Sequence, residues 1–357
     1  MSRPRYIWNT SALTMRHPRR AANASASAVL PDAVGPSTAM AVGWVADSVM
    51  ALAARRGHNR SMPHVVGIDC GGTSVRALAL EDGKTVWTGE GGAANLSWVS
   101  EAALAETLEQ ALEGCPDADA VCGAFAGLVD DRQRDAAGRL LSQRFPKGKV
   151  TVVPDYEAAL EASSGADVCV VAGTGSIVVS RLADGQVHRT GGRGYLLGDE
   201  GSAFQYGREA LLHYLDSPED DVSSSLREAV QEAFGATRRT EVVAGLYAAS
   251  DAPRRLASLL KAFAGDAEVG AVYALKAMKV HAGKLAHLLA IHVREALPLE
   301  RRQLLVACQG GLWRYPVLCH AFAEQVRFWV DADSVELDFE PPEPVLGAAK
   351  LAGRLIE

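Results

Sequence analysis

A unit that occurs twice constrains the fold of this chain more than any other feature of its sequence. The stretch VVGIDCGGTSVRALALEDGK at 65–84 is matched by VCVVAGTGSIVVSRLADGQ at 168–186. Each copy reads as a buried strand, a Gly-rich loop, a second strand and an Asp-Gly turn into a third strand. Helical and strand-like segments alternate after each copy. A unit of roughly one hundred residues that is repeated twice predicts two α/β domains facing each other, not a solenoid.

The segments that follow the two units give the order of the remaining elements. We expect Ser97 to cap a helix over 98–113, with three leucines spaced four residues apart on one face and Gly114 at its end. A helical region is expected over 202–296, because apolar residues recur there at helical spacing. A strand, a helix, a further strand and a last helix from Pro344 complete the chain.

Both Gly-rich loops are candidates for phosphate binding. Such a loop leaves backbone N–H groups free to point at phosphate oxygens, and Gly is needed where the backbone must come close or take φ > 0. One loop alone is more often a hairpin turn, but two at equivalent positions favour phosphate. Neither is a Walker A sequence, and each leads into a strand, unlike a dinucleotide-binding loop. The candidate residues are Asp69, Gly71, Gly72 and Thr73, and then Gly173, Thr174, Gly175 and Ser176.

Asp155 is the candidate catalytic base. It follows the strand-like run VTVVP and opens the helical segment YEAALEA. An Asp at this place can simply be an N-cap. The carboxyl ends of strands are also where open α/β folds keep their chemistry, and a kinase needs a base that receives the proton of the acceptor hydroxyl. One residue can fill both roles.

The segment GGRGYLLGDEGS at 191–202 is the densest motif of the chain. It contains five glycines around Leu196 and Leu197, followed by the adjacent acids Asp199 and Glu200. A glycine-rich surface loop seldom contains two leucines that look buried, followed by adjacent acids. We interpret the segment as a substrate loop in which Asp199 accepts hydroxyl groups of a sugar.

Charge and cysteine content limit the partners and the compartment. The chain has 36 basic and 43 acidic residues, a formal net charge of −7, which argues against a nucleic-acid or anionic-membrane partner. The six cysteines form no C-x-x-C pair and no zinc-type cluster. We therefore expect buried free thiols and a cytoplasmic location.

The first 62 residues differ in composition from the rest. They hold eight arginines, no lysine and two acidic residues, and the apolar stretch over 39–54 is too short to span a bilayer. An organellar transit segment has such a composition. A start codon assigned too early, with Met62 directly before the first strand, is the alternative that we favour. Either way we expect an extension outside the fold.

Together these motifs resemble the N-acetylglucosamine kinase branch of the BadF/BadG/BcrA/BcrD-type ATPases, over residues 64–357. The family's acid-x-Gly-Gly-Thr loop is similar to 69–73, its AGTGS loop to 172–176 and its GDEGS motif to 198–202. Its sugar-contacting Asn corresponds to Asn95, its catalytic Asp to Asp155, and its adenosine-side Gly pair to Gly310 and Gly311.

The resemblance implies an actin/hexokinase-like fold of two ribonuclease H-like α/β domains, 63–165 and 166–357, with a cleft between them and a last helix from about 344 packed back on the first domain. It implies transfer of the γ-phosphate of ATP to the 6-hydroxyl of an amino sugar, with Asp69 helping to hold Mg²⁺ through water. Asn95, Gly192, Arg193 and Asp199 would contact the sugar. The expected partner is a small sugar, with no nucleic acid and no membrane, and a homodimer stays open.

Two departures concern the sugar side. The family's Trp in a GGWG segment is Arg193 here, and a Ser near the sugar in the animal enzymes falls at Ala126. N-acetylglucosamine is therefore the first expectation and glucosamine the alternative. An activator ATPase of the same superfamily, which bridges an iron–sulfur cluster with cysteines, is a more distant alternative. A non-enzymatic sugar sensor is disfavoured by the intact Asp69, Asp155 and both loops.

Overall fold

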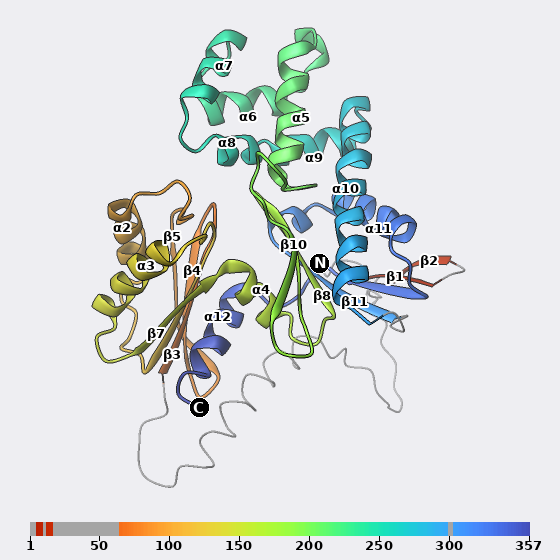
Figure 1. Ribbon diagram of the computed structural model, residues 1–357. Helices are drawn as coiled ribbons and strands as arrows, with labels where there is room; N and C mark the ends of the chain where they lie inside the picture. Colours follow the sequence, from red (N-terminus) through yellow and green to blue (C-terminus); the bar gives the residue numbers. More distant parts are fainter. Residues whose placement is uncertain (1–4, 10–11, 17–63, 299–302) are drawn as a thin grey trace, which may run out of the picture.

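The computed structural model describes residues 5–9, 12–16, 64–298 and 303–357, and it consists of two lobes, each built on a mixed sheet (Figure 1). The five strands of the first sheet lie in the order β5-β4-β3-β6-β7 and the seven of the second in the order β10-β9-β8-β11-β12-β1-β2. The two α/β units expected from the repeat are confirmed, because β3-β4-β5 and β8-β9-β10 are matching antiparallel runs.

Helices cover both faces of the first sheet. Its elements are β3 (His64–Cys70), β4 (Val75–Glu81), β5 (Lys84–Gly91), α2 (Glu101–Ala111), β6 (Ala120–Phe125), α3 (Asp131–Arg144), β7 (Lys149–Pro154) and α4 (Asp155–Ala162). Leu104, Leu108 and Leu141, from α2 and α3, pack on one face. The other face is covered by α4 and by the last helix of the chain. The central strands β3 and β6 are buried on both sides, which explains their continuous apolar sequence.

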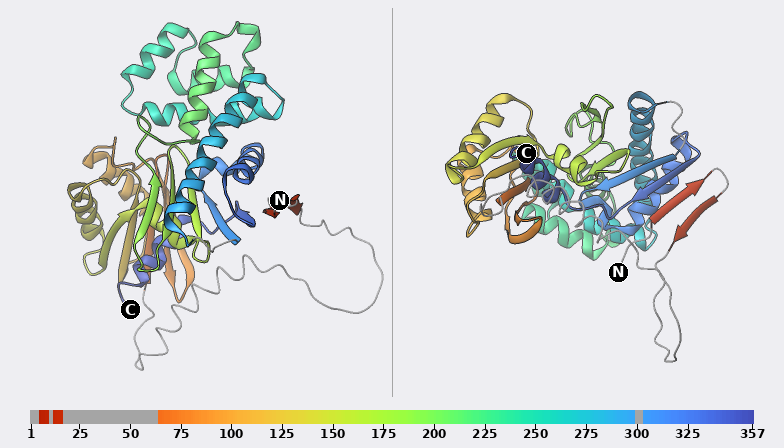
Figure 2. Two further views of the ribbon diagram at one scale, coloured as in Figure 1. Left: turned by 45° about the vertical axis from the view of Figure 1, so that its right-hand side comes forward. Right: turned by 90° about the horizontal axis from the view of Figure 1, so that it is seen from below.

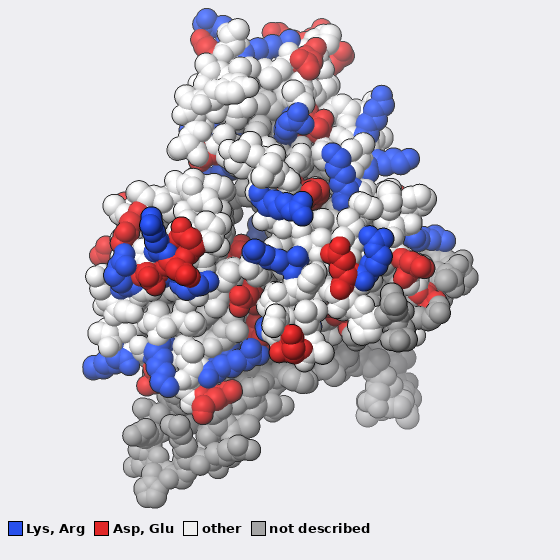
Figure 3. All heavy atoms as spheres, in the orientation of Figure 1, with Lys and Arg blue, Asp and Glu red and all other residues white. Residues whose placement is uncertain are grey.

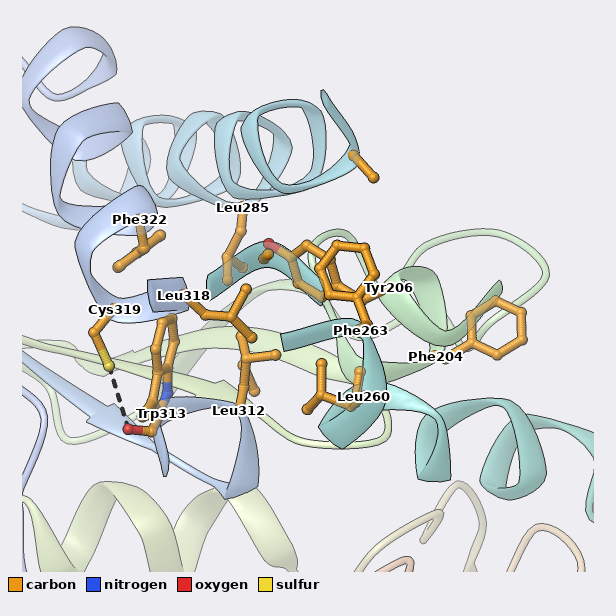
Figure 4. Packing of buried hydrophobic residues seen from close by; sticks show 14 of the residues in the cluster. Phe204, Tyr206, Leu260, Phe263, Leu285, Leu312, Trp313, Leu318, Cys319 and Phe322 are labelled. Carbon is orange, nitrogen blue, oxygen red and sulfur yellow. Dashed lines mark hydrogen bonds between the residues drawn. The ribbon is translucent and has the colours of Figure 1, made fainter. Parts of the chain in front are cut away.

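The second lobe adds a helical layer to its sheet. Its remaining elements are β8 (Val168–Ala172), β9 (Ser176–Arg181), β10 (Val187–Gly191), α5 (Ala203–Asp216), η1 (Glu219–Asp221), α6 (Ser224–Phe234), α7 (Arg239–Ala248), α8 (Ala252–Ser258), α9 (Leu260–Glu268), α10 (Val272–Ala296), β11 (Gln303–Gln309), η2 (Gly311–Arg314), α11 (Pro316–Trp329), β12 (Ser334–Asp338) and α12 (Pro344–Gly353). The helices expected over 202–296 are confirmed as α5 to α10, and Figure 2 shows α5 to α9 grouped beyond one end of the sheet. Their apolar faces share a core with Trp313 and Phe322 (Figure 4).

The last helix, α12, returns to the first lobe. It packs on β3, β6 and α4, so the C-terminal helix belongs to the first lobe although the strands before it belong to the second. Glycines make this approach possible. A Cβ at Gly67 of β3 would lie 2.4 Å from the backbone nitrogen of Ala349, and a Cβ at Gly347 of α12 would lie 1.9 Å from the carbonyl oxygen of Ala158. No side chain of any kind fits at either contact.

Part of the N-terminal segment lies within the fold. Strands β1 (Arg5–Asn9) and β2 (Ala12–Arg16) form an antiparallel pair, and β1 pairs antiparallel with β12 at the edge of the second sheet. The expectation that 1–62 forms an extension outside the fold is therefore wrong for these two strands. An edge strand leaves a row of backbone groups open, and the added pair covers that row on β12. The expectation for 17–62 lies outside the described residues.

The helix expected over 98–113 begins later than the sequence suggests. The N-cap of α2 is Ser100, whose hydroxyl accepts the N–H of Ala103, and not Ser97. Ser97 instead belongs to a turn with Asn95, because the Asn95 side chain accepts the N–H of Ser97 at 2.8 Å. Ser and Asn compete for such local bonds, so two serines three residues apart gave two possible starts.

Two further features concern the cysteines and the apolar helices. All six cysteines are free and buried, as expected. Among the described residues, no helix is long and apolar enough to cross a membrane.

Candidate active site

Two carboxyl groups lie at strand ends on one edge of the first sheet. Asp69 is the penultimate residue of β3, and Asp155 directly follows β7; β6 lies between these two strands. Because these three strands are parallel, their carboxyl ends meet at one edge of the sheet. The sequence placed both residues at strand ends, and the sheet order brings them together.

The environment raises the pKa of both groups. The pKa of Asp69 rises to about 7, mainly because the group is buried and next because the Asp155 carboxylate is close; Arg76 opposes the rise. Burial raises the pKa of Asp155 to about 6, against the bond from the Tyr156 N–H to its Oδ1, which is 2.9 Å long. The N-cap of α4 is Pro154, so Asp155 is the first residue of the helix and not its cap.

Arg76 is a residue of this site that the motif search did not identify. It lies directly opposite Asp69 in the antiparallel pairing of β3 with β4, and Nη1 donates to Oε1 of Glu343 at 2.9 Å. Its charge is therefore divided between Asp69 and the residue that precedes α12. The alternation of β4 could have indicated it, since a directly paired residue faces the same side of the sheet.

The two Gly-rich loops approach each other between the lobes. A Cβ at Gly72 would lie 3.4 Å from Oγ1 of Thr174, so the first loop touches the second at this point. We expected a need for positive φ at these glycines, but Gly71, Gly72, Gly173 and Gly175 all have negative or extended φ. What matters here is the missing side chain, because a Cβ at Gly175 would lie 2.9 Å from the Asp199 carboxylate.

The GDEGS segment and the start of α5 are hydrogen-bonded to the second loop. The first backbone N–H groups of α5 donate to loop carbonyls, from Ala203 to Gly173 at 2.8 Å and from Phe204 to Thr174 at 3.3 Å. Ser176 is held from the other side, because its hydroxyl donates to the carbonyl of Glu200 at 2.7 Å. The helix N-terminus therefore fixes the loop and is not itself a free anion site.

The Asp199 carboxylate lies against the second loop. Its Oδ1 accepts the N–H of Ser176 at 3.2 Å, and its φ of 57° is one of two positive values among the described non-glycine residues. Burial raises its pKa, and the bond from Ser176 opposes the rise. The sequence interpretation gave this carboxylate only to a sugar, and the structure adds an anchoring role for one of its oxygens.

Asn95 lies on the first lobe beside the first loop. It is 9% exposed, its Oδ1 is used within the turn, and a Cβ at Gly127 would lie 2.1 Å from that oxygen. The Nδ2 amide group is therefore the part of Asn95 that can donate to a ligand. The backbone at Ala126 is hydrogen-bonded to β3, because its N–H donates to the carbonyl of Cys70 at 2.9 Å.

Near the start of the expected sugar loop, Gly192 is constrained by its surroundings and Arg193 is exposed. Gly192 has a φ of 64°, and a Cβ there would lie 2.6 Å from Cδ1 of Ile177, so this position requires Gly. Arg193 follows and is exposed. On the face drawn in Figure 3, basic and acidic side chains alternate, and the surface is hollowed between the two lobes.

The Gly310–Gly311 pair lies behind the second loop. Gly310 has a φ of 109°, and a Cβ there would lie 2.3 Å from the carbonyl oxygen of Ala172, the residue before the loop. The pair also connects β11 to η2, whose Trp313 donates Nε1–H to the carbonyl of Gln309 at 2.9 Å. The structure thus brings Gly310 against Ala172, the residue before the second loop, although the two are far apart in the sequence.

Comparisons with known proteins agree with this arrangement. The family model described as the BadF/BadG/BcrA/BcrD ATPase family matches residues 66–352. An N-acetylmuramic acid/N-acetylglucosamine kinase of Clostridium acetobutylicum is 25% identical over 268 residues, which cover 70% of this chain and 86% of that protein. An N-acetyl-D-glucosamine kinase of Dictyostelium discoideum is 27% identical over 209 residues, 51% of this chain and 64% of that protein.

A solved structure extends the comparison to the fold. A candidate N-acetylglucosamine kinase from Chromobacterium violaceum superposes with a TM-score of 0.61 at 26% identity, covering 82% of this chain and 100% of that chain. At this coverage the match extends over both lobes.

Proposed function

The chain belongs to the BadF/BadG/BcrA/BcrD ATPase family, and from this premise we propose that it is an ATP-dependent kinase of amino sugars, with N-acetylglucosamine as substrate and its 6-hydroxyl as acceptor. The actin/hexokinase-like fold expected from the sequence is confirmed. One observation carries the proposal: the Asp155 carboxyl, with a pKa of about 6, lies at the sheet edge shared with Asp69, and Asp69 begins the Gly loop that touches the second loop.

The loops supply the nucleotide side of the proposed reaction. Gly71 to Thr73 and Gly173 to Ser176 would hold the phosphates through backbone N–H groups and hydroxyls, and Gly310 with Gly311 would lie toward the adenosine. Kinase catalysis consists mostly of positioning and charge neutralisation, so the fixing of the second loop by α5 serves this function directly.

The carboxyl pair fits a divalent cation. Two neighbouring carboxylates repel each other, as the raised pKa of Asp69 shows, and a cation next to Asp69 would relieve that repulsion. Mg²⁺ is commonly held by one or two carboxylates, water and substrate phosphates, and when bound it neutralises phosphate charge.

Asp155 would act as the base. A base works best when its pKa lies near the working pH, and a value of about 6 leaves the group ionised at neutral pH yet able to hold a proton. The bond from Tyr156 fixes one oxygen and leaves the other for the acceptor hydroxyl.

The residues around the sugar favour an N-acetyl group over a free amine. An acetamide needs an amide or backbone partner, which Nδ2 of Asn95 and the backbone near Gly192 can provide. A free amine is cationic, and Arg193 would repel it if turned inward, while burial of an unpaired charge is costly. The names of the two kinase relatives include N-acetylglucosamine and support the same choice.

The first test is a coupled ADP-release assay over N-acetylglucosamine, glucosamine, glucose and N-acetylmannosamine. We expect the highest kcat/KM for N-acetylglucosamine, and a smaller preference over glucosamine in Arg193→Trp, because the repelling charge is removed. A preference of the wild-type protein for glucosamine would refute the sugar. A preference that Arg193→Trp leaves unchanged would keep the sugar and refute the role of Arg193.

The pH dependence is expected to differ between binding and turnover. The raised pKa values keep Asp155 and Asp69 protonated at low pH, so the ionised, active forms appear as pH rises through about 6 and about 7. The kcat/KM for MgATP, which reports the free protein, should rise through both values, whereas kcat should follow only the Asp155 ionisation. Initial rates from pH 5 to 8.5 measure this, and a kcat/KM that falls between pH 6 and 8 would contradict it.

The remaining expectations are part of the proposal. A small sugar is the proposed partner, a cytoplasmic location is proposed, and a homodimer stays open. The activator ATPase alternative gains nothing from the structure, because a bridging cluster needs accessible thiols, and all six cysteines, each within the described residues, are buried.

A further inference from the structure

Within the described residues the chain crosses between the two lobes twice; the connection from β2 to β3 lies outside them. It leaves the first lobe at the end of α4 and enters the second through 163–167, before β8. It returns from β12 through 339–343 into α12, which packs on the first lobe. Any movement of one lobe relative to the other must be taken up at these two short connections or in the helices beside them.

The two helices beside the connections form one block. The closeness of Gly347 to the Ala158 carbonyl leaves no room for sliding between α12 and α4. Glu161, a buried residue of α4, is bonded to Arg354 beyond α12 and also lies 3.6 Å from Arg181 of β9. The two connections therefore link this block to the second sheet, and 163–167 is also bonded to β11, because the N–H of Asp167 donates to the carbonyl of Leu305 at 2.8 Å and the N–H of Leu305 donates to Oδ2 of Asp167 at 2.9 Å.

One side chain joins the two connections. The Nε2 amide of Gln309 donates to Oγ of Ser163 at 3.1 Å and to the carbonyl of Pro342 at 2.7 Å. Gln309 is 4% exposed and is the last residue of β11, the strand between β8 and β12. Both hydrogens of one NH₂ group are thus used, one on each crossing, which a hydroxyl or a single N–H cannot do.

Gln309 directly precedes the glycine pair on the proposed nucleotide side. Gly310 follows it and lies against the Ala172 carbonyl, immediately before the second loop. At the other crossing, Ser163 ends the helix that Asp155 begins. Gln309 therefore connects, through a few bonds, the proposed base with the proposed phosphate loop.

We propose that Gln309 is a positioning residue that holds the two crossings at a fixed spacing and thereby aligns Asp155 with the second phosphate loop. This role rests on the proposed kinase function, but its structural part does not. Without the two bonds, each connection moves independently, and the base and the phosphate no longer keep one distance. An error of about 1 Å in such an alignment can lower turnover on the order of 10²-fold.

The test variant is Gln309→Met, which keeps the length of the side chain and removes both donors. We expect kcat to fall tenfold or more, on the order set by misalignment, with dissociation constants for ATP and sugar within about twofold in calorimetry, because neither ligand is bound by this amide. Hydrogen exchange of peptides covering 163–167 and 339–343 should rise in both connections in the ligand-free protein.

Tyr273→Phe is the matched control for lost stability. It removes a buried hydrogen bond to Asp266 within the helical layer, away from both crossings. It should lower the melting temperature while leaving kcat and exchange at the connections unchanged. If Gln309→Met behaves like this control, its role is structural only and the proposal is wrong.

Ser163→Ala distinguishes one crossing from two. It removes one of the two bonds, so its loss of kcat should be smaller than that of Gln309→Met, and the double variant should lose no more than Gln309→Met alone. Fully additive losses would overturn the coupling. If the wild-type protein phosphorylates no sugar, the kinase proposal fails, while faster exchange in both connections would still support the hinge contact and exchange in neither would refute it.

Discussion

Asp155→Asn is expected to lower kcat by about 10²–10⁴-fold while sugar affinity stays within a few-fold, because the amide keeps the shape of the side chain but cannot accept the proton of the acceptor hydroxyl. The Oδ1 of Asn can still accept the N–H of Tyr156, so the start of α4 is preserved. Steady-state rates with N-acetylglucosamine and calorimetric sugar binding measure the two effects separately. Turnover within tenfold of the wild-type value would rule out Asp155 as the base.

Stability provides the control for this variant. The folded-state pKa of Asp155 is raised to about 6, so the folded protein binds this proton more tightly than the unfolded chain does. The stabilisation from the protonated form is present at low pH and is lost as pH rises through about 6. At pH 8 the ionised carboxylate therefore destabilises the fold, and Asp155→Asn should unfold at the same or a higher temperature than the wild-type protein. An inactive variant that is also less stable at pH 8 would point to misfolding instead.

Gly347→Ala is expected to destabilise the fold strongly, because the added methyl group has no room between α12 and α4. The new Cβ would lie 1.9 Å from the Ala158 carbonyl oxygen and 2.6 Å from the Ala162 nitrogen, so α12 must move away from α4. Both neighbours are helix backbone and cannot rotate aside. Overpacking usually costs about 1–3 kcal/mol, and the backbone contacts place this case at about 3 kcal/mol, which corresponds to a loss of about 10 °C in Tm.

Gly353→Ala is the matched variant in the same helix. A Cβ at Gly353 meets no atom within 4 Å, and the residue has no positive φ. Replacing an unstrained Gly in a helix removes backbone entropy from the unfolded chain, so the protein should become more stable by up to about 1 kcal/mol. Thermal unfolding of both variants decides the matter. Equal shifts would show that α12 does not pack on α4 as closely as described.

Local chemistry made the main architecture readable from the sequence. The repeated strand–loop–strand unit predicted two facing α/β lobes, and both sheets contain the matching antiparallel runs. Asp69 and Asp155 could be recognised because each follows an apolar run that can only be a buried strand. Such patterns depend on residues close together in the chain, and periodicity is a local property.

Competition between similar local signals limited what the sequence could settle. Ser97 and Ser100 are both good caps, and the choice of Ser100 depends on the Gly127 backbone, to which Ser97 donates. The edge strands β1 and β2 were missed for a related reason. The strand that joins them to the sheet, β12, pairs with β1 and lies more than three hundred residues later in the chain, and no local pattern indicates such a partner.

The sequence by itself determined which residues are candidates for the chemistry, because strand ends, Gly loops and acidic side chains are local features of the chain. Only the tertiary structure decided how they act on one another. The pKa of Asp69 depends on its distance to Asp155, Asp199 accepts the Ser176 N–H across 23 positions, and Gln309 reaches Ser163 across 146. Hydrogen bonds and charge interactions depend on separations of a few ångströms in space, and those separations are fixed by sheet order and helix packing.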